Sequence, residues 1–119
     1  MPVRLLTQSV VRWPEPEQVL REVRDWAQEQ AGRVPSLERV AVFGSYGRGS
    51  AGVGSDLDLL LIDAAASGPQ QQRLRHWPLE LLPLSCDALV LTRSEHEALM
   101  AAGSRFAVEL ERDARWLWP

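Results

Sequence analysis

The chain has 119 residues, enough for one hydrophobic core but not for two, so we expect a single domain over residues 1–119. Apolar residues make up 45% and charged residues 24%, which is ordinary for a soluble globular protein and indicates neither a disordered nor a fibrous class. The formal net charge is −3, and all 13 cationic side chains are arginines, spread over both halves of the chain. No basic region of the kind that binds duplex DNA or RNA is therefore expected.

Cysteine content and hydropathy indicate the cellular compartment of the protein. Cys86 is the single cysteine, so no internal disulfide can form, and no Cys/His spacing is typical of a zinc site. The N-terminus lacks the long apolar stretch of a signal peptide, and no apolar run approaches the length of about 18 residues that a membrane-spanning helix needs. We expect a soluble, cytoplasmic protein without a membrane partner.

The first part of the chain contains one clear helix. Residues 1–14 show no period and are predicted to form an N-terminal arm or a short edge strand. Residues 16–31 are predicted to form an amphipathic helix, with Pro16 in its first turn and Gly32 as its C-terminal stop. The apolar face of this helix consists of Val19, Leu20, Val23, Trp26, Ala27 and Ala31.

Two predicted strands flank a glycine-rich segment. Residues 39–43 are short, apolar and rich in β-branched side chains, as in a buried strand. Residues 44–54 contain five glycines, which let main-chain amides approach a ligand closely. Residues 57–62 form the second predicted strand. Because side chains alternate across a strand, Asp56 and Asp58 should face one side, and the other side should carry Leu57, Leu59 and Leu61.

The second half of the chain adds shorter elements. Ser94 and Glu97 have the Ser-x-x-Glu form of a capping box, which predicts a helix start. The remaining predicted elements are a short helix over 73–77, a strand over 86–92, a second C-terminal helix after Gly103-Ser104, and a closing strand over 115–118. These patterns predict an α/β fold with a small mixed sheet flanked by helices.

Acidic residues on two of these strands predict a metal site. Asp56 and Asp58 are held side by side, and Asp87 lies at the start of the third predicted strand, where strand pairing can bring it to the same rim. Like charges held together repel each other, so such a site usually binds a cation. Three carboxylates around two divalent ions suit phosphoryl or nucleotidyl transfer.

The turn before the glycine-rich loop predicts a phosphate site. Gly44 and Ser45 can offer amide hydrogens and a hydroxyl to the β and γ phosphates, at the start of a short helix. Arg48 is the nearest cation for a triphosphate.

These motifs resemble those of the minimal nucleotidyltransferases of the polymerase-β-like superfamily, the antitoxins of HEPN/MNT toxin–antitoxin pairs. The resemblance rests on Gly-Ser-Tyr-Gly-Arg-Gly from Gly44, followed by Ser55-Asp-Leu-Asp-Leu. It implies that Asp56 and Asp58 bind two Mg²⁺ ions, and that Asp87 binds one of them and helps to activate the nucleophile. It also implies that Ser45 holds the triphosphate of ATP, with Ser55 among the nucleotide-binding residues.

The implied activity is transfer of AMP from ATP to a tyrosine of a cognate HEPN ribonuclease toxin, in a hetero-oligomer. Two alternatives stay open: nucleotidyl transfer to a small molecule, as in aminoglycoside-modifying relatives, and a non-catalytic antitoxin that binds nucleotide and masks its partner. One departure from the family pattern is Tyr46-Gly47, because the added glycine weakens helix formation after Ser45.

The other polar and aromatic candidates are assigned structural roles. His76 and His96 lack metal-ligand spacing, and Cys86 is expected to be a small buried residue. Trp116 and Trp118 alternate with a leucine, so one face of the terminal strand can meet a partner.

Overall fold

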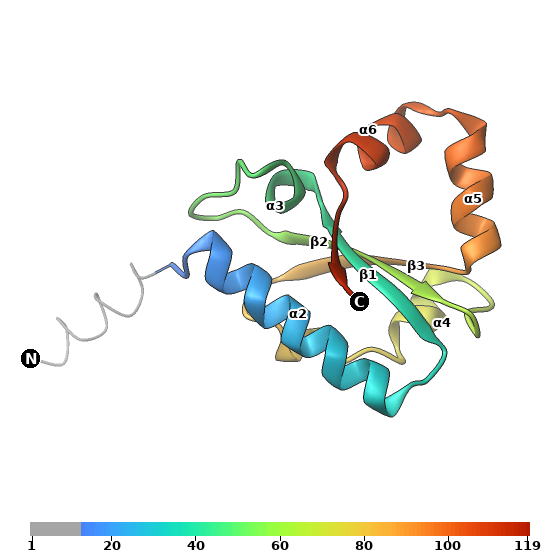
Figure 1. Cartoon of the computed structure of the whole chain (residues 1–119), viewed down its shortest axis with the longest axis horizontal. Coiled ribbons are helices and arrows are strands. Elements are labelled where there is room, and N and C mark those ends of the chain that lie inside the picture. The colour runs from blue at the N-terminus through green and yellow to red at the C-terminus, as the bar shows by residue number, and fades with distance from the viewer. Residues whose placement is uncertain (1–12) are drawn as a thin grey trace, which may run out of the picture.

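The computed structural model describes residues 13–119. The predicted N-terminal arm or edge strand at residues 1–14 therefore lies almost wholly outside the described residues. The elements in chain order are α2 (Pro16–Arg33), β1 (Leu37–Phe43), α3 (Gly44–Arg48), β2 (Leu57–Asp63), α4 (Gln70–Leu74), the 3₁₀ turn η1 (Leu79–Leu81), β3 (Cys86–Leu91), α5 (Arg93–Ala102), α6 (Arg105–Asp113) and β4 (Arg115–Trp118). Figure 1 shows their arrangement.

Within this part of the chain, four strands form one sheet in the order β3-β2-β1-β4. β1 pairs antiparallel with both β2 and β4, whereas β2 and β3 run parallel. A parallel pair needs a crossover connection, and α4 and η1 lie in it. The predicted α/β fold with a small mixed sheet is thus confirmed.

The sheet is covered on both faces. Leu57, Leu59 and Leu61 are buried on one face against α2, whose apolar side chains are those predicted from helical spacing. Leu60 and Ile62 are buried on the other face, against α5 and α6. Figure 1 shows α2 on one side of the sheet and the α5–α6 pair on the other. Burial on both faces explains why β2 reads as a nearly continuous apolar run after Asp58.

Three predicted helix boundaries are wrong. Gly32 does not stop α2, which continues to Arg33. The short helix predicted over 73–77 instead spans Gln70–Leu74, after Pro69 as its N-cap. The capping box of α5 is formed by Thr92 and Glu95 rather than by Ser94 and Glu97.

The choice of capping box has a tertiary cause. Thr92-x-x-Glu95 and Ser94-x-x-Glu97 both fit the sequence pattern. Glu95 also receives two hydrogen bonds from the buried Arg73, at 2.6 and 2.9 Å. This pair fixes Glu95 at the third helical position and so makes Thr92 the cap.

Side chains form hydrogen bonds with main-chain groups on both edge strands of the sheet. At the β3 edge, the side-chain amide of Gln70 donates to the carbonyl of Val90 at 2.8 Å and accepts from its N–H at 3.0 Å. At the β4 edge, Nε of Arg24 donates to the carbonyl of Leu117 at 3.2 Å. In the described residues, no helix is long and apolar enough to cross a membrane.

Candidate functional site

Strand pairing brings the predicted carboxylates to one end of the sheet. Asp58 on β2 is the register partner of Asp87 on β3 and also of Phe43, the last residue of β1. Asp56 lies one residue before β2. Asp58 is half-buried, while Asp56 and Asp87 are exposed. The two strand aspartates are therefore neighbours across a parallel pair, beside the turn that follows β1.

The electrostatics of this end are unfavourable to an isolated anion. Burial raises the pKa of Asp58, the charges of Asp87 and then Asp56 raise it further, and Arg48 opposes them. Carboxylate oxygens are the donors that Mg²⁺ binds in proteins, so the donor set fits a divalent cation. Among residues 13–119, however, no three His, Cys, Asp or Glu side chains are gathered closely enough to hold an ion between them.

Gly44 joins the phosphate turn to the carboxylates. Its φ of +62° lies in the left-handed region. A Cβ at this position would overlap Oδ2 of Asp58. Glycine is thus required for two separate reasons, and the main chain of the turn lies directly against the half-buried carboxylate. Ser45, the next residue, is half-buried at the start of α3.

The glycine-rich loop is held together by short-range hydrogen bonds. The N–H of Ser50 donates to the carbonyl of Ser45 at 3.0 Å. Ser55 Oγ accepts from the N–H of Gly52 at 3.0 Å, and the N–H of Ser55 donates to the carbonyl of Gly52 at 3.0 Å. Ser55, predicted as a nucleotide-binding residue, therefore shapes the loop in this structure.

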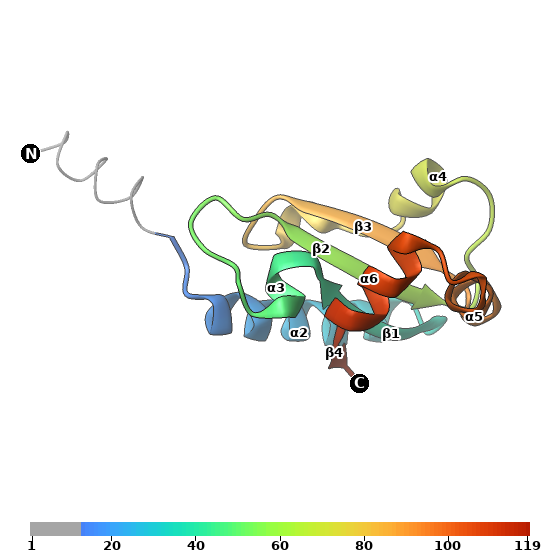
Figure 2. The same ribbon diagram turned by 90° about the horizontal axis from the view of Figure 1, so that it is seen from above.

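Arg48 has a partner that the sequence analysis missed. Its Nη1 donates to Oδ2 of Asp113 at 3.0 Å, across 65 residues of sequence. α3 forms despite Gly47, and a Cβ at Gly47 would overlap the carbonyl oxygen of Asp113. Figure 2 shows α3 and α6 side by side. A weak sequence signal for Asp113 existed, because an acid at the C-terminal end of a helix opposes the helix dipole.

The remaining candidates lie in structural surroundings. Burial, followed by the charges of Asp58 and Asp87, raises the pKa of the Cys86 thiol to about 12, so the thiol stays protonated at neutral pH. His76 is exposed, and the half-buried His96 packs edge-on against Trp116 with ring centroids 5.8 Å apart.

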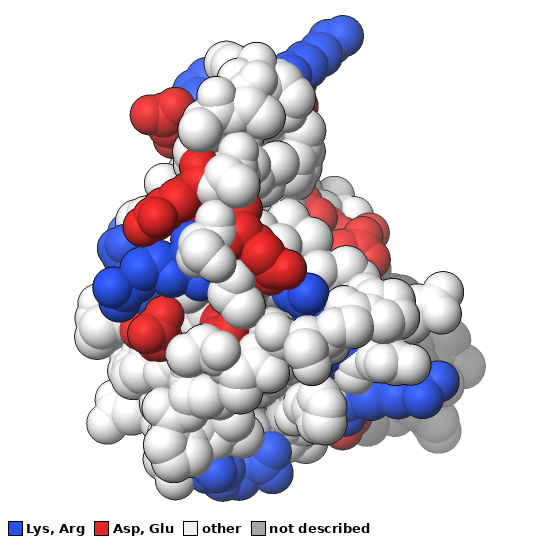
Figure 3. All heavy atoms as spheres, turned by 90° about the vertical axis from the view of Figure 1, so that its right-hand side faces the viewer, with Lys and Arg blue, Asp and Glu red and all other residues white. Residues whose placement is uncertain are grey.

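The surface around His96 carries charges of both signs. The guanidinium of Arg39 covers the ring of Trp116 at 3.7 Å. Arg93 lies 3.5 Å from Glu38, measured between Nη2 and Oε2. Figure 3 shows arginine and acidic side chains interspersed on this end of the molecule, without a large area of one sign. This face does not resemble a nucleic-acid surface.

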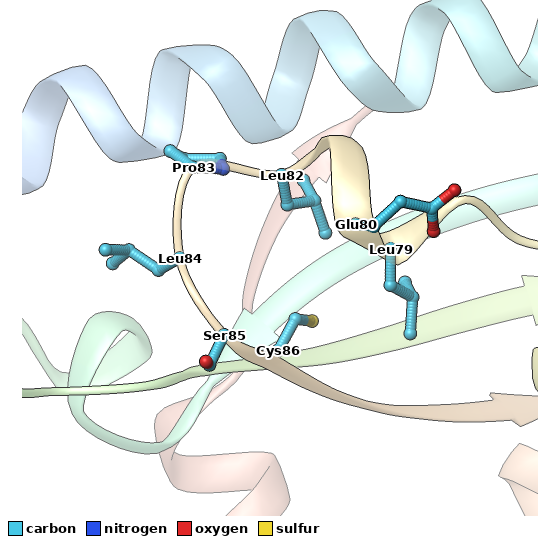
Figure 4. A pocket seen from close by; sticks show the side chains of 7 residues that line it. All are labelled: Leu79, Glu80, Leu82, Pro83, Leu84, Ser85 and Cys86. Carbon is cyan, nitrogen blue, oxygen red and sulfur yellow. The ribbon is translucent and has the colours of Figure 1, made fainter.

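A cavity lies next to β3. It has a volume of about 470 Å³ and is lined by residues 79, 80 and 82–86. Figure 4 shows Leu79, Leu82 and Cys86 turned toward the space that this segment encloses, whereas Leu84 points away from it. Cys86 is adjacent to Asp87 in sequence, so the cavity borders the strand that carries this carboxylate.

The glycine-rich turn and the strand aspartates lie within the part of the chain that matches a known protein family. The nucleotidyltransferase domain family matches residues 20–116, and the chain belongs to this family. No curated protein sequence matches the chain.

Two solved structures share the fold. The first is a candidate nucleotidyltransferase from Sulfolobus solfataricus, with a TM-score of 0.64 and 22% identity, covering 87% of this chain and 82% of that chain. The second is a toxin–antitoxin crystal structure with AMP-PNP, with a TM-score of 0.54 and 17% identity, covering 80% of this chain and 72% of that chain.

Proposed function

We propose that this protein is a Mg²⁺-dependent nucleotidyltransferase that moves AMP from ATP onto a tyrosine of a partner toxin of the HEPN ribonuclease class. The observation that carries the proposal is the register pairing of Asp58 with Asp87 beside the Gly44-Ser45 turn. Membership of the nucleotidyltransferase family supports the reaction type. The toxin–antitoxin neighbour with AMP-PNP supports an adenine nucleotide as the ligand and a toxin as the partner.

Each site residue has an assigned task in this proposal. Asp56, Asp58 and Asp87 would hold divalent cations, which lower the pKa of an attacking hydroxyl and neutralise charge on the phosphates. Ser45 binds the triphosphate, with the main chain of Gly44 beside it.

The proposed transfer is a single displacement. The tyrosine oxygen bonds to the α-phosphorus of ATP, the bond to the bridging oxygen breaks, and pyrophosphate leaves. Asp87 accepts the phenolic proton, because it lies on the edge strand β3, one strand further from the Gly44-Ser45 turn than Asp58. The attacking and leaving oxygens then lie on opposite sides of the reacting phosphorus.

The acceptor is proposed to be a macromolecule brought to the site. The exposed Asp56 and Asp87 leave the carboxylate end open to solvent. The described elements are all parts of, or packed against, the single sheet. A protein partner that supplies its own tyrosine fits this arrangement better than a small molecule does. A small molecule would need additional protein surface around it to be bound.

The test is a transfer assay. The protein is incubated with α-labelled ATP, Mg²⁺ and the product of the adjacent reading frame, with Asp56→Asn as the inactive control and Glu80→Gln as an exposed control. We expect label on the partner with the wild type and with Glu80→Gln, and none with Asp56→Asn. Label at a residue other than tyrosine would contradict the acceptor assignment alone.

A masking antitoxin is a second candidate, favoured by one observation. The acidic side chains of residues 13–119 are not gathered into a closed ion-binding cluster. A protein that only binds nucleotide and covers its partner needs no such closure. Full neutralisation of the partner by Asp56→Asn, with no label transferred by the wild type, would establish this candidate and refute the enzyme.

A further inference from the structure

Asp113 is a buried carboxylate at the C-terminal end of α6, with 5% of its surface exposed. It accepts hydrogen bonds from two arginines. Arg112 donates from Nε at 2.8 Å and from Nη2 at 3.2 Å, and Arg48 donates from Nη1 at 3.0 Å. The carboxylate of Asp113 is thus shared by two guanidinium groups, one from α3 and one from α6.

The main chain of residue 113 touches α3 as well. Its carbonyl oxygen occupies the space where a Cβ of Gly47 would lie. α3 is thus held from two sides, by Asp58 against Gly44 and by Asp113 against Gly47 and Arg48. Both contacts are long-range, so the geometry of the turn depends on the position of α6.

Arg48 keeps donors available after it has bound Asp113. Its side chain is 46% exposed, and a guanidinium has five N–H donors, of which the contact with Asp113 uses one. Arg48 is the last residue of α3, which begins at Gly44 and Ser45, so it lies within about one helical turn of the phosphate turn. An arginine held in place by one carboxylate loses less freedom when it binds a second anion.

We propose that Asp113 is a positioning residue that orients Arg48 toward the triphosphate of the bound nucleotide. This inference rests on the proposed function, because it takes a nucleoside triphosphate as the ligand of the Gly44-Ser45 turn. Asp113 itself touches no phosphate. It acts through Arg48, so its carboxylate has no effect on nucleotide binding once Arg48 is replaced.

A purely structural role makes a different prediction. If Asp113 only anchored α6, its replacement would weaken nucleotide binding to the same extent with or without Arg48. If Asp113 acts through Arg48, the two replacements are not additive, because both remove the same interaction.

The experiment measures the affinity of the full chain for ATP with Mg²⁺, without acceptor, by calorimetry. The variants are Asp113→Asn, Arg48→Gln and the double variant, and thermal unfolding confirms that each is folded. Glu109→Gln is the matched control, because Glu109 is on the same helix and pairs with Arg105 at the surface, 3.5 Å away. We expect Glu109→Gln to bind like the wild type.

We expect Asp113→Asn to weaken binding about three- to tenfold, as for the loss of one charge-assisted hydrogen bond. The double variant should bind like Arg48→Gln alone. In transfer assays, Asp113→Asn should raise KM for ATP and leave kcat within about twofold, because Arg48 contributes to binding and not to the displacement.

Several results would overturn the inference. Additive effects in the double variant, or unchanged affinity in Asp113→Asn, would remove the positioning role while leaving the proposed function intact. If Asp113→Asn does not fold, the affinity of Arg48→Lys for ATP is measured instead. A lysine keeps the charge but lacks the planar guanidinium that can contact Asp113 and a phosphate together. Wild-type affinity in Arg48→Lys would then refute the inference. A wild type that binds no nucleotide would refute the proposed function as well.

Discussion

Two carboxylates at different places in the fold have opposite surroundings. Asp58 is partly buried next to Asp87 and Asp56, and its pKa is raised, first by burial and then by these charges. Glu95, at the start of α5, has its pKa lowered to about 2, chiefly by hydrogen bonds from Arg73. The negative charges around Asp58 are not paired with an equal number of cations among the described residues, whereas the charge of Glu95 is paired with Arg73. Under the proposed function the first arrangement binds a ligand, whereas the second stabilises the fold.

The second arrangement ties three elements together. Arg73 on α4 is buried and donates to both carboxylate oxygens of Glu95. It also donates to the carbonyls of Val90 on β3 and of Gly68, both at 2.8 Å. The charge of the buried Arg73 guanidinium is therefore paired within the fold, and no ligand is required to compensate it.

The largest effect should come from removing the unbalanced charge. We expect Asp58→Asn to reduce transfer to the partner by at least about 100-fold, because a carboxylate is lost where phosphate charge must be neutralised. Without metal, the unfolding temperature of this variant should not fall, because like-charge repulsion is relieved. Added Mg²⁺ should raise the unfolding temperature of the wild type but not that of Asp58→Asn. Equal stabilisation of both proteins by Mg²⁺ would place the metal elsewhere.

A smaller effect should come from disturbing the contact between α3 and α6. Gly47 and Gly32 are both helical, but only at Gly47 would a Cβ overlap another atom, the carbonyl oxygen of Asp113. We expect Gly47→Ala to lower the free energy of unfolding by about 1–3 kcal/mol. Gly32→Ala should raise it by about 0.5–1 kcal/mol, since nothing lies within 4 Å of the new methyl group. Urea unfolding measures both, and equal effects would show that α6 does not press against α3.

The smallest effect should come from the balanced pair and should depend on pH. The pKa of Glu95 is about 2 in the folded chain, against an ordinary value of 4.5. Above pH 4.5 the carboxylate is charged in both states, so its pairing with Arg73 stabilises the fold in full. As the pH falls from 4.5 toward 2, the unfolded state takes up the proton first and this stabilisation is lost.

We therefore expect the wild type to be more stable than Glu95→Gln at neutral pH, with the difference shrinking below pH 4.5. Glu97→Gln, on the exposed side of the same helix, is the control. Denaturant unfolding over a pH series measures the difference. A gap between wild type and Glu95→Gln that stayed constant at low pH would contradict the assignment.

Local patterns predicted the strands and the carboxylate end well. Alternation along residues 57–62 placed Asp58 opposite the leucines, and the structure buries those leucines against α2. The position of Asp87 beside Asp58 followed from the start of a neighbouring strand, and the parallel register confirms it. These inferences rest on a period of two residues, which sequence shows directly.

Contacts between distant segments could not be predicted in the same way. The pairing of Arg48 with Asp113 spans 65 residues, and no local period connects them. The expectation that Gly47 would weaken the turn was based on helix propensity, but packing against Asp113 overrides propensity there. The capping box of α5 was misplaced by two residues, because two overlapping patterns fit and only Arg73 distinguishes them.

The side chains on the sheet edges limit how a partner can bind. The N–H and carbonyl of Val90 are both bonded to Gln70, and the carbonyl of Leu117 is bonded to Arg24. An incoming strand would have to displace these side chains before it could pair with the main chain at either place. Growth of the sheet by adding a foreign strand, or by joining two copies edge to edge, is therefore disfavoured at Val90 and Leu117. Under the proposed function, a protein acceptor is expected to contact other parts of the surface than these two edge positions.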